Sequence, residues 1–310
     1  MSFNTIPAFS MSDIQGRDAQ TIAALKLALT THGFFTITDH GISDEILQSS
    51  YKFSKDFFLL PKDVKNAYAH PDKAGARGYT PFGKETAVGE KTPDLKEFWH
   101  HGPSVNETYD PRIAKNITVS EILDFNNQFD ILFNQLNLLG MKVLSAIAII
   151  LDKEPSFFDS WVTKGNSVLR LIHYPPVDDP SNVLRARAHE DINLITLLLG
   201  TQQEGLEVLD KNNNWIPIET NSDIIVCNVG DMLQRLTNHR LKSTTHKVIN
   251  PMNSNKNLSR YSMPFFVHLN PDFLIKTLPQ CINNEHPDLY PESILANDYL
   301  NMRLKEINLK

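Results

Sequence analysis

Three His-x-Asp pairs in the sequence have the spacing of metal ligands. Two histidines and one carboxylate on one side of a metal, with open positions opposite, form the kind of site in which non-haem iron(II) activates O2. Residues i and i+2 of a strand point the same way, so one such pair can supply two of the three ligands. Because the chain has 11 histidines, roughly one pair arises by chance, and its context must decide whether it is a site.

The surrounding sequence favours one of the three pairs. Residues 70–72 and 286–288 each have a central proline, which interrupts strand pairing, so both are predicted to be surface turns. His189 and Asp191 instead precede residues 193–199, whose apolar character indicates a buried strand. His246 opens a further predicted strand and is the candidate third ligand. Taken alone, the pair is equally compatible with a core histidine beside a turn aspartate.

An arginine and a serine follow two residues apart. Arg260 and Ser262 share one face of a predicted strand, and a guanidinium beside a hydroxyl suits the far carboxylate of a dicarboxylate. An isolated Arg-x-Ser is more often an exposed charge on a strand. The order His-x-Asp, then His, then Arg-x-Ser, each on its own strand, favours a binding site.

Short strands must position these residues. After residue 165, apolar segments alternate with polar turns such as residues 210–214. The segments are residues 168–174, 193–199, 206–209, 215–218, 224–229, 246–250 and 261–269. Many short strands at near-regular spacing predict a sandwich or jelly roll. The expected fold class is therefore mainly β with flanking helices.

Helical patterns dominate the first half of the chain. Residues 21–31 read as an amphipathic helix, and Ser43 is the predicted N-cap of a helix that extends toward Pro61. Residues 34–38 between them are aromatic and β-branched, which predicts a strand. Residues 70–116 lack periodicity and are predicted to be a long loop region, of the kind that often covers a site.

The strongest periodicity starts near residue 118. Thr118 and Glu121 have the spacing of a capping box, and apolar residues then recur every three or four positions to Val143. This pattern predicts a long backbone helix packed on a sheet, with a last helix in residues 291–310. The expected organisation is a helical and loop region (1–116), a long backbone helix (117–164) and a jelly-roll core with a C-terminal helix (165–310).

Composition limits the setting of the protein. The 310 residues are 41% hydrophobic and carry a dispersed net charge of −6, which predicts neither a nucleic-acid-binding arm nor a membrane patch. Cys227 and Cys281 are too few for a disulfide framework. The first residues carry no leader, and the apolar run 141–151 is too short for a bilayer. We therefore expect a cytoplasmic monomer or weak homo-oligomer without a nucleic-acid or membrane partner.

The order of motifs along nearly the whole chain resembles the isopenicillin N synthase-like group of iron/2-oxoglutarate oxygenases, and most closely its bacterial members. The segments that carry the resemblance are residues 6–9, 32–35, 39–42, 169–176, 228–231, 237–238 and 242–246, with Tyr299, Leu300 and Arg303 near the end. The combination is specific for the family and says nothing of the substrate.

The resemblance implies a distorted double-stranded β-helix (jelly roll) core and a set of functional residues. His189, Asp191 and His246 would bind Fe(II). Arg260 and Ser262 would hold the distal carboxylate of 2-oxoglutarate, with the Tyr174 hydroxyl beside them. With O2, such an enzyme oxidises a C–H bond of a small-molecule substrate and releases succinate and CO2.

Two departures from the family pattern affect what can be transferred. Plant members usually have asparagine two residues before the tyrosine, where this chain has Ile172. One polar contact near the co-substrate is therefore absent, and the substrates of plant members do not carry over. The turn at residues 252–257 is also a few residues longer than usual, which a hairpin absorbs at little cost.

Candidate substrate contacts are less well defined. Arg185 and Arg187 alternate in phase with His189, so they either face the cavity and meet an anionic group or, more commonly for arginine, lie in solvent. Tyr79 and Phe82 lie in the long loop and are predicted to form a lid. Phe265 either lines the pocket or packs beneath it.

Two other interpretations remain open. Isopenicillin N synthase itself keeps an Arg-x-Ser pair but uses no 2-oxoglutarate, and amino-cyclopropane carboxylate oxidases also depart from its use. A non-catalytic, cupin-like jelly roll that binds a ligand or a structural metal belongs to another class, and a complete triad with an open face argues against it.

Overall fold

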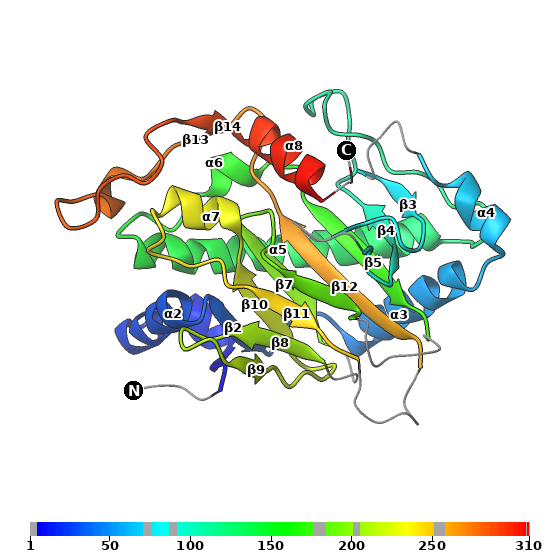
Figure 1. The fold of residues 1–310 in the computed structure, drawn as a ribbon, viewed down its shortest axis with the longest axis horizontal. Coiled ribbons are helices and arrows are strands. Elements are labelled where there is room, and N and C mark those ends of the chain that lie inside the picture. The colour runs from blue at the N-terminus through cyan, green and yellow to red at the C-terminus, as the bar shows by residue number, and fades with distance from the viewer. Residues whose placement is uncertain are drawn as a thin grey trace.

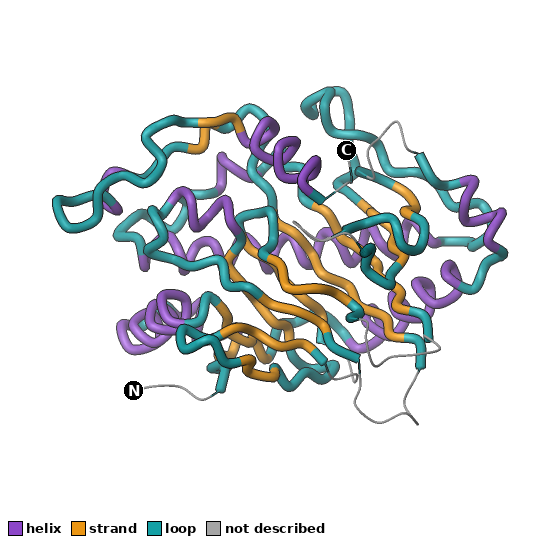
Figure 2. Tube along the Cα trace, viewed as in Figure 1, coloured by secondary structure: helices purple, strands orange, loops and turns teal. Residues whose placement is uncertain are grey.

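Two β-sheets that face each other across a cavity form the centre of the computed structural model, which describes residues 5–70, 76–86, 92–176, 184–200, 205–250, 258–307 and 309. The strands gather in the middle of the molecule and the helices lie around them (Figure 2). The expected fold class, mainly β with flanking helices, is confirmed.

The larger sheet has eight strands within the described ranges, in the order β1-β2-β10-β7-β12-β5-β4-β3. These are β1 (Ala8–Ser10), β2 (Phe34–Thr38), β3 (Gly78–Thr80), β4 (Glu97–His101), β5 (Val168–Tyr174), β7 (Ile195–Leu199), β10 (Ile225–Val229) and β12 (Arg260–Val267). Among these strands β1 and β2 pair in parallel, and the other pairs are antiparallel. The sheet joins strands from both the 1–116 and the 165–310 regions.

The smaller sheet has the order β6-β11-β8-β9. Its strands are β6 (Ala186–His189), β8 (Leu206–Leu209), β9 (Trp215–Pro217) and β11 (His246–Val248). A separate pair, β13 (Leu274–Ile275) and β14 (Ile294–Leu295), precedes the last helix.

The longest helix and several shorter ones cover the large sheet on the side away from the small one. The longest, α5 (Phe125–Ile150), runs behind the sheet in Figure 1 and contacts β4, β7 and β12. The others are α1 (Met11–Gly16), α2 (Ala19–Thr31), α3 (Asp44–Phe58), α4 (Lys62–Ala67), α6 (Asp159–Val162), α7 (Asp231–Leu236) and α8 (Ala296–Glu306), with a 3-10 turn at Pro279–Cys281. Helix α8 crosses the upper edge of the sheets in Figure 1.

Several local predictions are confirmed. Ser43 caps α3, because its hydroxyl accepts a hydrogen bond from the Ile46 backbone N–H at 3.4 Å. Residues 34–38 form β2, and all seven strand segments after residue 165 form strands within a few residues of the expected bounds. Residues 210–214 form the expected turn, closed by backbone N–H groups that donate to the Asp210 side chain.

The start of the long helix was predicted wrongly. Helix α5 begins at Phe125, because Asp124 adopts the left-handed conformation (φ 62°) and interrupts any helix from residue 118. Glu121 accepts a hydrogen bond from the Tyr68 hydroxyl instead of closing a capping box. Helix α5 is also long and apolar enough to cross a membrane by length and composition, contrary to the expectation from residues 141–151, but 56% of its most apolar window is buried against the protein.

Two strands lie in the region predicted to be a long loop. Strand β4 pairs with both β3 and β5, and its Phe98 and Trp99 are buried. Its polar residues Glu97, His100 and His101 made it resemble a loop. Each has a partner from a distant segment, so β4 is a buried strand without an apolar sequence pattern.

Candidate metal centre

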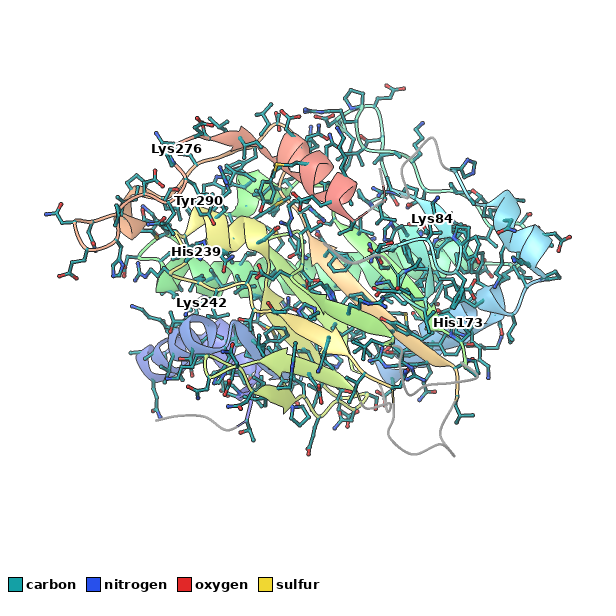
Figure 3. All side chains as sticks on the ribbon, in the orientation of Figure 1. Lys84, His173, His239, Lys242, Lys276 and Tyr290 are labelled. Carbon is teal, nitrogen blue, oxygen red and sulfur yellow. The ribbon has the colours of Figure 1, made fainter. Side chains whose placement is uncertain are left out.

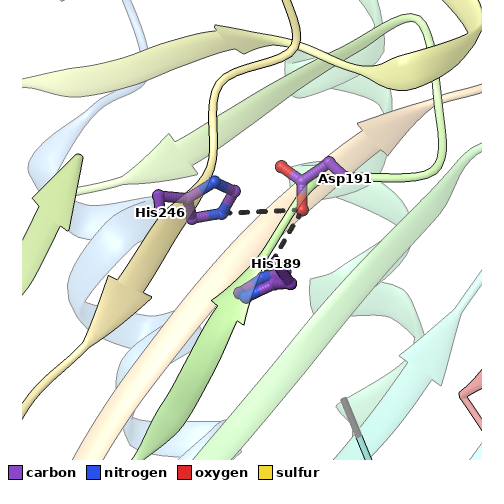
Figure 4. Close-up of side chains that lie close together, drawn as sticks. All are labelled: His189, Asp191 and His246. Atoms are coloured by element: carbon purple, nitrogen blue, oxygen red, sulfur yellow. Dashed lines mark ion pairs between the residues drawn. The ribbon is translucent and has the colours of Figure 1, made fainter. Parts of the chain in front are cut away.

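Three side chains converge at one end of the small sheet. His189 ends β6, His246 begins β11, and Asp191 follows β6 by two residues (Figure 4). Asp191 Oδ1 lies 3.8 Å from His189 Nε2 and 3.7 Å from His246 Nε2. The candidate ligand atoms all lie within 4.8 Å of one another. The pairing of β6 with β11, which sets His189 opposite His246, creates this proximity.

Backbone contacts fix both imidazole rings for metal binding. The Nδ1 of His189 is 2.7 Å from the Arg187 carbonyl, and the Nδ1 of His246 is 3.1 Å from the Thr244 carbonyl. A carbonyl only accepts, so each Nδ1 carries the proton and each Nε2 presents a lone pair to the centre. Burial and the nearby His246 lower the pKa of His189 to about 4, which keeps its ring neutral.

Asp191 is also oriented by hydrogen bonds. Its Oδ2 accepts from Thr196 Oγ1 at 2.6 Å and from Asn228 Nδ2 at 2.8 Å, which leaves Oδ1 facing the two histidines. Burial opposes ionisation, yet His246, His189 and these donors lower the pKa of Asp191 overall. A carboxylate and two neutral imidazoles on one face match the donor set of a non-haem iron(II) site, so these residues would hold the metal.

The turn that carries Asp191 is held against the start of α7. Backbone N–H groups of residues 230–232 donate to carbonyls of residues 191–194 at 2.9–3.0 Å. The two backbones approach so closely that a Cβ on Gly230 would lie 2.0 Å from Asn193 Oδ1. Asn193 in turn donates to the Thr196 hydroxyl at 2.8 Å, which directs that hydroxyl's proton to Asp191.

A cavity of about 430 Å³ extends from this centre between the two sheets. Alternate residues of the large sheet line it, because every second side chain of a strand faces the same way. They are Val168, Arg170, Ile172 and Tyr174 on β5, and Ser262, Pro264, Phe266 and, one position beyond the strand, His268 for β12. Leu300, Arg303 and Leu304 of α8 close the cavity at its edge.

A buried cation to which the described residues offer no counter-ion lies next to one end of the cavity. Arg260 pairs with Tyr174 across β12 and β5, and its guanidinium lies 5.4 Å from the Tyr174 ring centroid. Its side chain is buried, and neither Nε nor Nη1 has a hydrogen-bond partner in the described part of the chain. An orphaned buried guanidinium is costly unless an anion meets it. Beside Ser262 and Tyr174, it fits the distal carboxylate of 2-oxoglutarate.

The departure at Ile172 lies at this end. Ile172 pairs with Ser262 across the two strands, and both side chains line the cavity. The position therefore presents an apolar surface where plant relatives present an amide. The other departure, the turn at residues 252–257, lies outside the described residues.

Arg185 and Arg187 do not line the cavity. Strand β6 has a bulge, because His189 pairs with His246 while Ala186, three residues earlier, pairs with Val248 two residues later. The extra residue shifts the alternation, so that Ala186 and Ala188 line the cavity. Arg185 is buried and donates to the Leu258 carbonyl at 2.7 Å, and Arg187 pairs with Asp94 at 3.2 Å.

None of the three aromatic candidates lines the cavity, and Phe265 takes the second of its two predicted positions. Tyr79 is buried in β3, and its hydroxyl donates to Glu97 on the side of the sheet away from the cavity. Phe82 is exposed and does not line the cavity. Phe265 packs beneath the pocket against Phe133, with ring centroids 5.0 Å apart, and its neighbour Phe266 lines the cavity instead.

The sequence pattern did not predict a charged cluster in the cavity wall. Glu85, Asp94 and Lys96 lie in the region predicted to be a loop, yet all three are buried and line the cavity. Lys96 pairs with Glu85 at 2.7 Å and with Asp94 at 3.0 Å. Arg170 could have been found, because it alternates with Ile172 and Tyr174 along β5.

The remaining His-x-Asp pairs lie away from this centre. Residues 286–288 form an exposed turn, as predicted, and Asp288 accepts from the Thr277 hydroxyl. His70 lies outside the cavity wall, and Asp72 is outside the described residues. His239 and Tyr290 meet beside α7 (Figure 3), with stacked rings 5.6 Å apart.

Two family models match most of the chain. The model described as 2OG-Fe(II) oxygenase superfamily matches residues 165–269, and the model described as non-haem dioxygenase in morphine synthesis N-terminal matches residues 6–121. The first contains the three converging residues as well as Arg260 and Ser262.

Named relatives and solved structures agree with these models. A proline hydroxylase of Petromyces alliaceus is 32% identical over 308 residues, which cover 95% of both chains. A 2-oxoglutarate-dependent dioxygenase of Monascus ruber is 34% identical, over 86% of this chain and 83% of its own.

Two crystal structures share the whole fold. A protein of the 2OG-Fe(II) oxygenase family from Caulobacter crescentus superposes with a TM-score of 0.86 at 44% identity, covering 97% of this chain and 98% of that one. A full-length Neurospora crassa protein in complex with alpha-KG gives 0.85 at 29% identity, over 97% and 95%. These neighbours confirm the jelly-roll core.

Proposed function

The chain belongs to the 2OG-Fe(II) oxygenase superfamily and is an iron(II)- and 2-oxoglutarate-dependent oxygenase, and we propose that it oxidises a C–H bond of a small molecule held between its two sheets. Arg260, whose Nε and Nη1 meet no partner among the described residues, lies on the same face of β12 as the cavity-lining Ser262, and this observation carries the use of 2-oxoglutarate here. The same Neurospora crassa protein has been crystallised with alpha-KG and thymine, at 27% identity to this chain. That complex supports a small-molecule substrate.

Separate sets of residues would bind the metal and the co-substrate. Iron(II), once bound with 2-oxoglutarate, activates O2 and supplies the oxidant for the substrate C–H bond, with succinate and CO2 as the by-products. His189, Asp191 and His246 would hold the metal, and the Arg187 and Thr244 carbonyls fix the ring protons on Nδ1, away from that position.

Arg260, Ser262 and the two-sheet cavity set the orientation of the co-substrate. Burial lowers the pKa of Arg260, but a guanidinium remains charged at neutral pH and so binds a carboxylate strongly. The apolar wall of Phe34, Leu198 and Val226 around the centre excludes bulk water from the reaction.

Anaerobic titration with iron(II) and then 2-oxoglutarate tests this function. A weak visible charge-transfer band reports the chelate, and succinate is measured after O2 is admitted. We expect His189→Ala to lose the band and Arg260→Ala to need much more 2-oxoglutarate to form it. Arg112→Ala, which removes an exposed cation outside the cavity wall, should bind 2-oxoglutarate like the wild type.

Two outcomes distinguish the rival functions. Iron binding without a band, and O2 consumption without succinate, would indicate an isopenicillin N synthase-type oxidase. Tight zinc binding with no oxygen uptake would indicate a non-catalytic, cupin-like protein.

We also propose a cytoplasmic location and a monomer or weak homo-oligomer without nucleic-acid partners. Cys227 and Cys281 are both free and buried, which suits a reducing compartment. The net charge of −6 disfavours nucleic acid. Cell fractionation and light scattering at several protein concentrations test these statements.

A further inference from the structure

The end of the cavity opposite Arg260 carries positive charge that the co-substrate does not use. We propose that Asn166, Arg170 and His268, here called the outer subsite, bind an anionic group of the substrate that the enzyme oxidises. This substrate is a small carboxylic acid with an apolar body. The inference rests on the proposed oxygenase function and names the substrate class for it.

The outer subsite sits at the far end of the β5 and β12 pairing. His268 N–H donates to the Ser167 hydroxyl at 3.1 Å, which places His268 beside Asn166, and all three subsite residues line the cavity. Arg260 lies eight positions earlier along the same chain segment as His268. The carboxylate of 2-oxoglutarate bound at Arg260 therefore cannot neutralise the outer subsite.

A buried arginine lies directly behind the outer subsite. Arg77 is 1% exposed, and its guanidinium packs on Gly102 so tightly that a Cβ there would lie 2.1 Å from its Cζ. Among the described residues no carboxylate pairs with it, and its Nε has no partner. Burial lowers the pKa of Arg77 to about 10, so it is charged at neutral pH. A fixed cation of this kind favours an anion nearby.

Arg77 also determines which atom Asn166 shows to the cavity. Its Nη2 donates to Asn166 Oδ1 at 2.9 Å. The oxygen of this amide is therefore occupied, and its Nδ2 is left as a donor, with no partner in the described part of the chain. A donor at this point suits a carboxylate oxygen.

Arg170 belongs to a network in which two buried carboxylates each pair with two cations. Glu85 pairs with Arg170 at 3.2 Å and also with Lys96, and Asp94 pairs with Lys96 and with Arg187. Each of these two carboxylates is thus shared between two cations. Arg170 Nε donates to His100 and Nη1 to Glu85, while Nη2 has no hydrogen bond within the described ranges. That N–H group remains to meet a ligand.

His268 adds a neutral donor to the same place. It is 7% exposed, and its ring nitrogens have no hydrogen-bond partner among the residues that the structure describes. Burial, with the charges of Arg77 and Arg170, lowers the pKa of His268 to about 4, so one nitrogen donates and the ring is uncharged. Glu190 also lines the cavity, but beside the metal ligand Asp191 rather than in this subsite.

The surfaces around the subsite are apolar. Val168, Phe266 and Leu300 line the cavity between the outer subsite and the metal centre. A substrate anchored there by its carboxylate would place its apolar body against these side chains and toward the triad. The cavity of about 430 Å³, shared with 2-oxoglutarate, limits that body to a small group.

Matched acids and amides test the proposal. The full-length protein is loaded with Mn(II), a paramagnetic and redox-stable stand-in for iron, and with saturating 2-oxoglutarate. Phenylacetate and phenylacetamide, and cyclohexanecarboxylate with its amide, are titrated while the relaxation of their protons is followed by NMR. Zn(II)-loaded protein is the diamagnetic blank, so that enhanced relaxation reports binding inside the cavity. We expect the acids to bind about tenfold more tightly than the amides.

Two variants separate the outer subsite from the general charge of the wall. Arg170→Gln should reduce the preference for acids to about twofold or less. Arg112→Gln removes an exposed cation, paired with Asp110 outside the cavity wall, so the preference should persist. If Arg170→Gln does not fold, as judged by circular dichroism, the acid and amide affinities of the wild type still decide.

Different results would overturn the outer subsite and the oxygenase function. Equal binding of acids and amides, or no relaxation enhancement by either, overturns the outer subsite while 2-oxoglutarate still binds. Failure of the wild type to bind metal and 2-oxoglutarate at all overturns the oxygenase function instead.

Discussion

The two faces of the large sheet differ in how completely their buried charges are paired. On the face away from the cavity, Glu97 accepts from Lys65 at 2.8 Å, from His173 at 2.8 Å and from the Tyr79 hydroxyl. His173, near the sheet end beside α3 in Figure 3, also contacts the Ser259 hydroxyl at 3.0 Å. On the cavity face, Arg260 and Arg77 have donors that no described residue meets.

The difference shows how a buried polar group can be interpreted. Residues next to each other on β5 and β12, such as His173 and Tyr174, belong to different faces and to different tasks. A network whose members all have partners holds strands together, whereas an isolated cation that the fold leaves unpaired requires a ligand from outside. The opposite effects of mutation on the two faces should therefore be measurable.

The largest expected effect comes from removing Glu97 from the hydrogen-bonded network on the face away from the cavity, here called the satisfied face. Glu97→Ala would leave Lys65 buried without its carboxylate, and we expect a loss of about 3–5 kcal/mol in the free energy of unfolding. Urea titration of the metal-free protein measures it. Asp56→Ala breaks the exposed Lys52–Asp56 pair of 2.6 Å and should cost less than about 1 kcal/mol. Equal losses in the two variants would refute the distinction.

The opposite sign is expected on the cavity face. Arg260→Met removes a buried cation to which the described residues offer no counter-ion, so the metal-free protein should gain about 1–3 kcal/mol in its free energy of unfolding. The same variant should bind 2-oxoglutarate roughly 10–100-fold more weakly, because charge-assisted hydrogen bonds are lost. Arg187→Met, which removes a cation paired with Asp94, should be destabilised. A destabilised Arg260→Met would contradict the interpretation of Arg260 as a ligand site.

A smaller effect is expected beside the metal ligands. Thr196→Val removes a hydrogen bond to Asp191 Oδ2, so the carboxylate is held less firmly and iron(II) affinity should fall roughly 10-fold. Thr36→Val is the matched control, because its hydroxyl is also buried in the large sheet but donates to the Pro7 carbonyl away from the cavity. Anaerobic iron titration measures both. An unchanged affinity in Thr196→Val would show that Asn228 alone suffices.

The site was more predictable from the sequence than the strands around it. The ligands could be found because their residue types are rare and their order along the chain is fixed by the family. Strands such as β2 and β7 could be predicted because most of their buried side chains are apolar. Strand β4 could not, because Glu97 and His100 are buried only with partners from other segments, and local sequence does not reveal such pairs.

The orientation of side chains escaped prediction for a related reason. A single bulge in β6 moves Arg185 and Arg187 off the cavity face, and no residue type in the strand predicts this bulge. Asp191 accepts hydrogen bonds from Thr196 and Asn228, which lie on two other strands. Residue type and spacing therefore indicate what the site can bind, but pairing between strands decides which neighbours complete it.

The smallest expected effect is the pH dependence of the satisfied face. Burial raises the pKa of Glu97, but the hydrogen bonds from His173, Lys65 and Tyr79 outweigh it, so its pKa lies below the ordinary value. The stability that the carboxylate contributes is therefore complete above the unfolded pKa of about 4.3. It is lost as the pH falls from there through the lower pKa of the folded state.

Glu97→Gln isolates this contribution. The difference in free energy of unfolding between the wild type and Glu97→Gln should stay constant from pH 7 to about 5 and shrink below that, because both proteins are then uncharged at this position. Urea titrations across the pH range measure the difference. A gap that widens in acid would mean that the carboxylate binds its proton more readily in the folded protein, and Glu97 would then belong with the unmet groups of the cavity face rather than with the satisfied network.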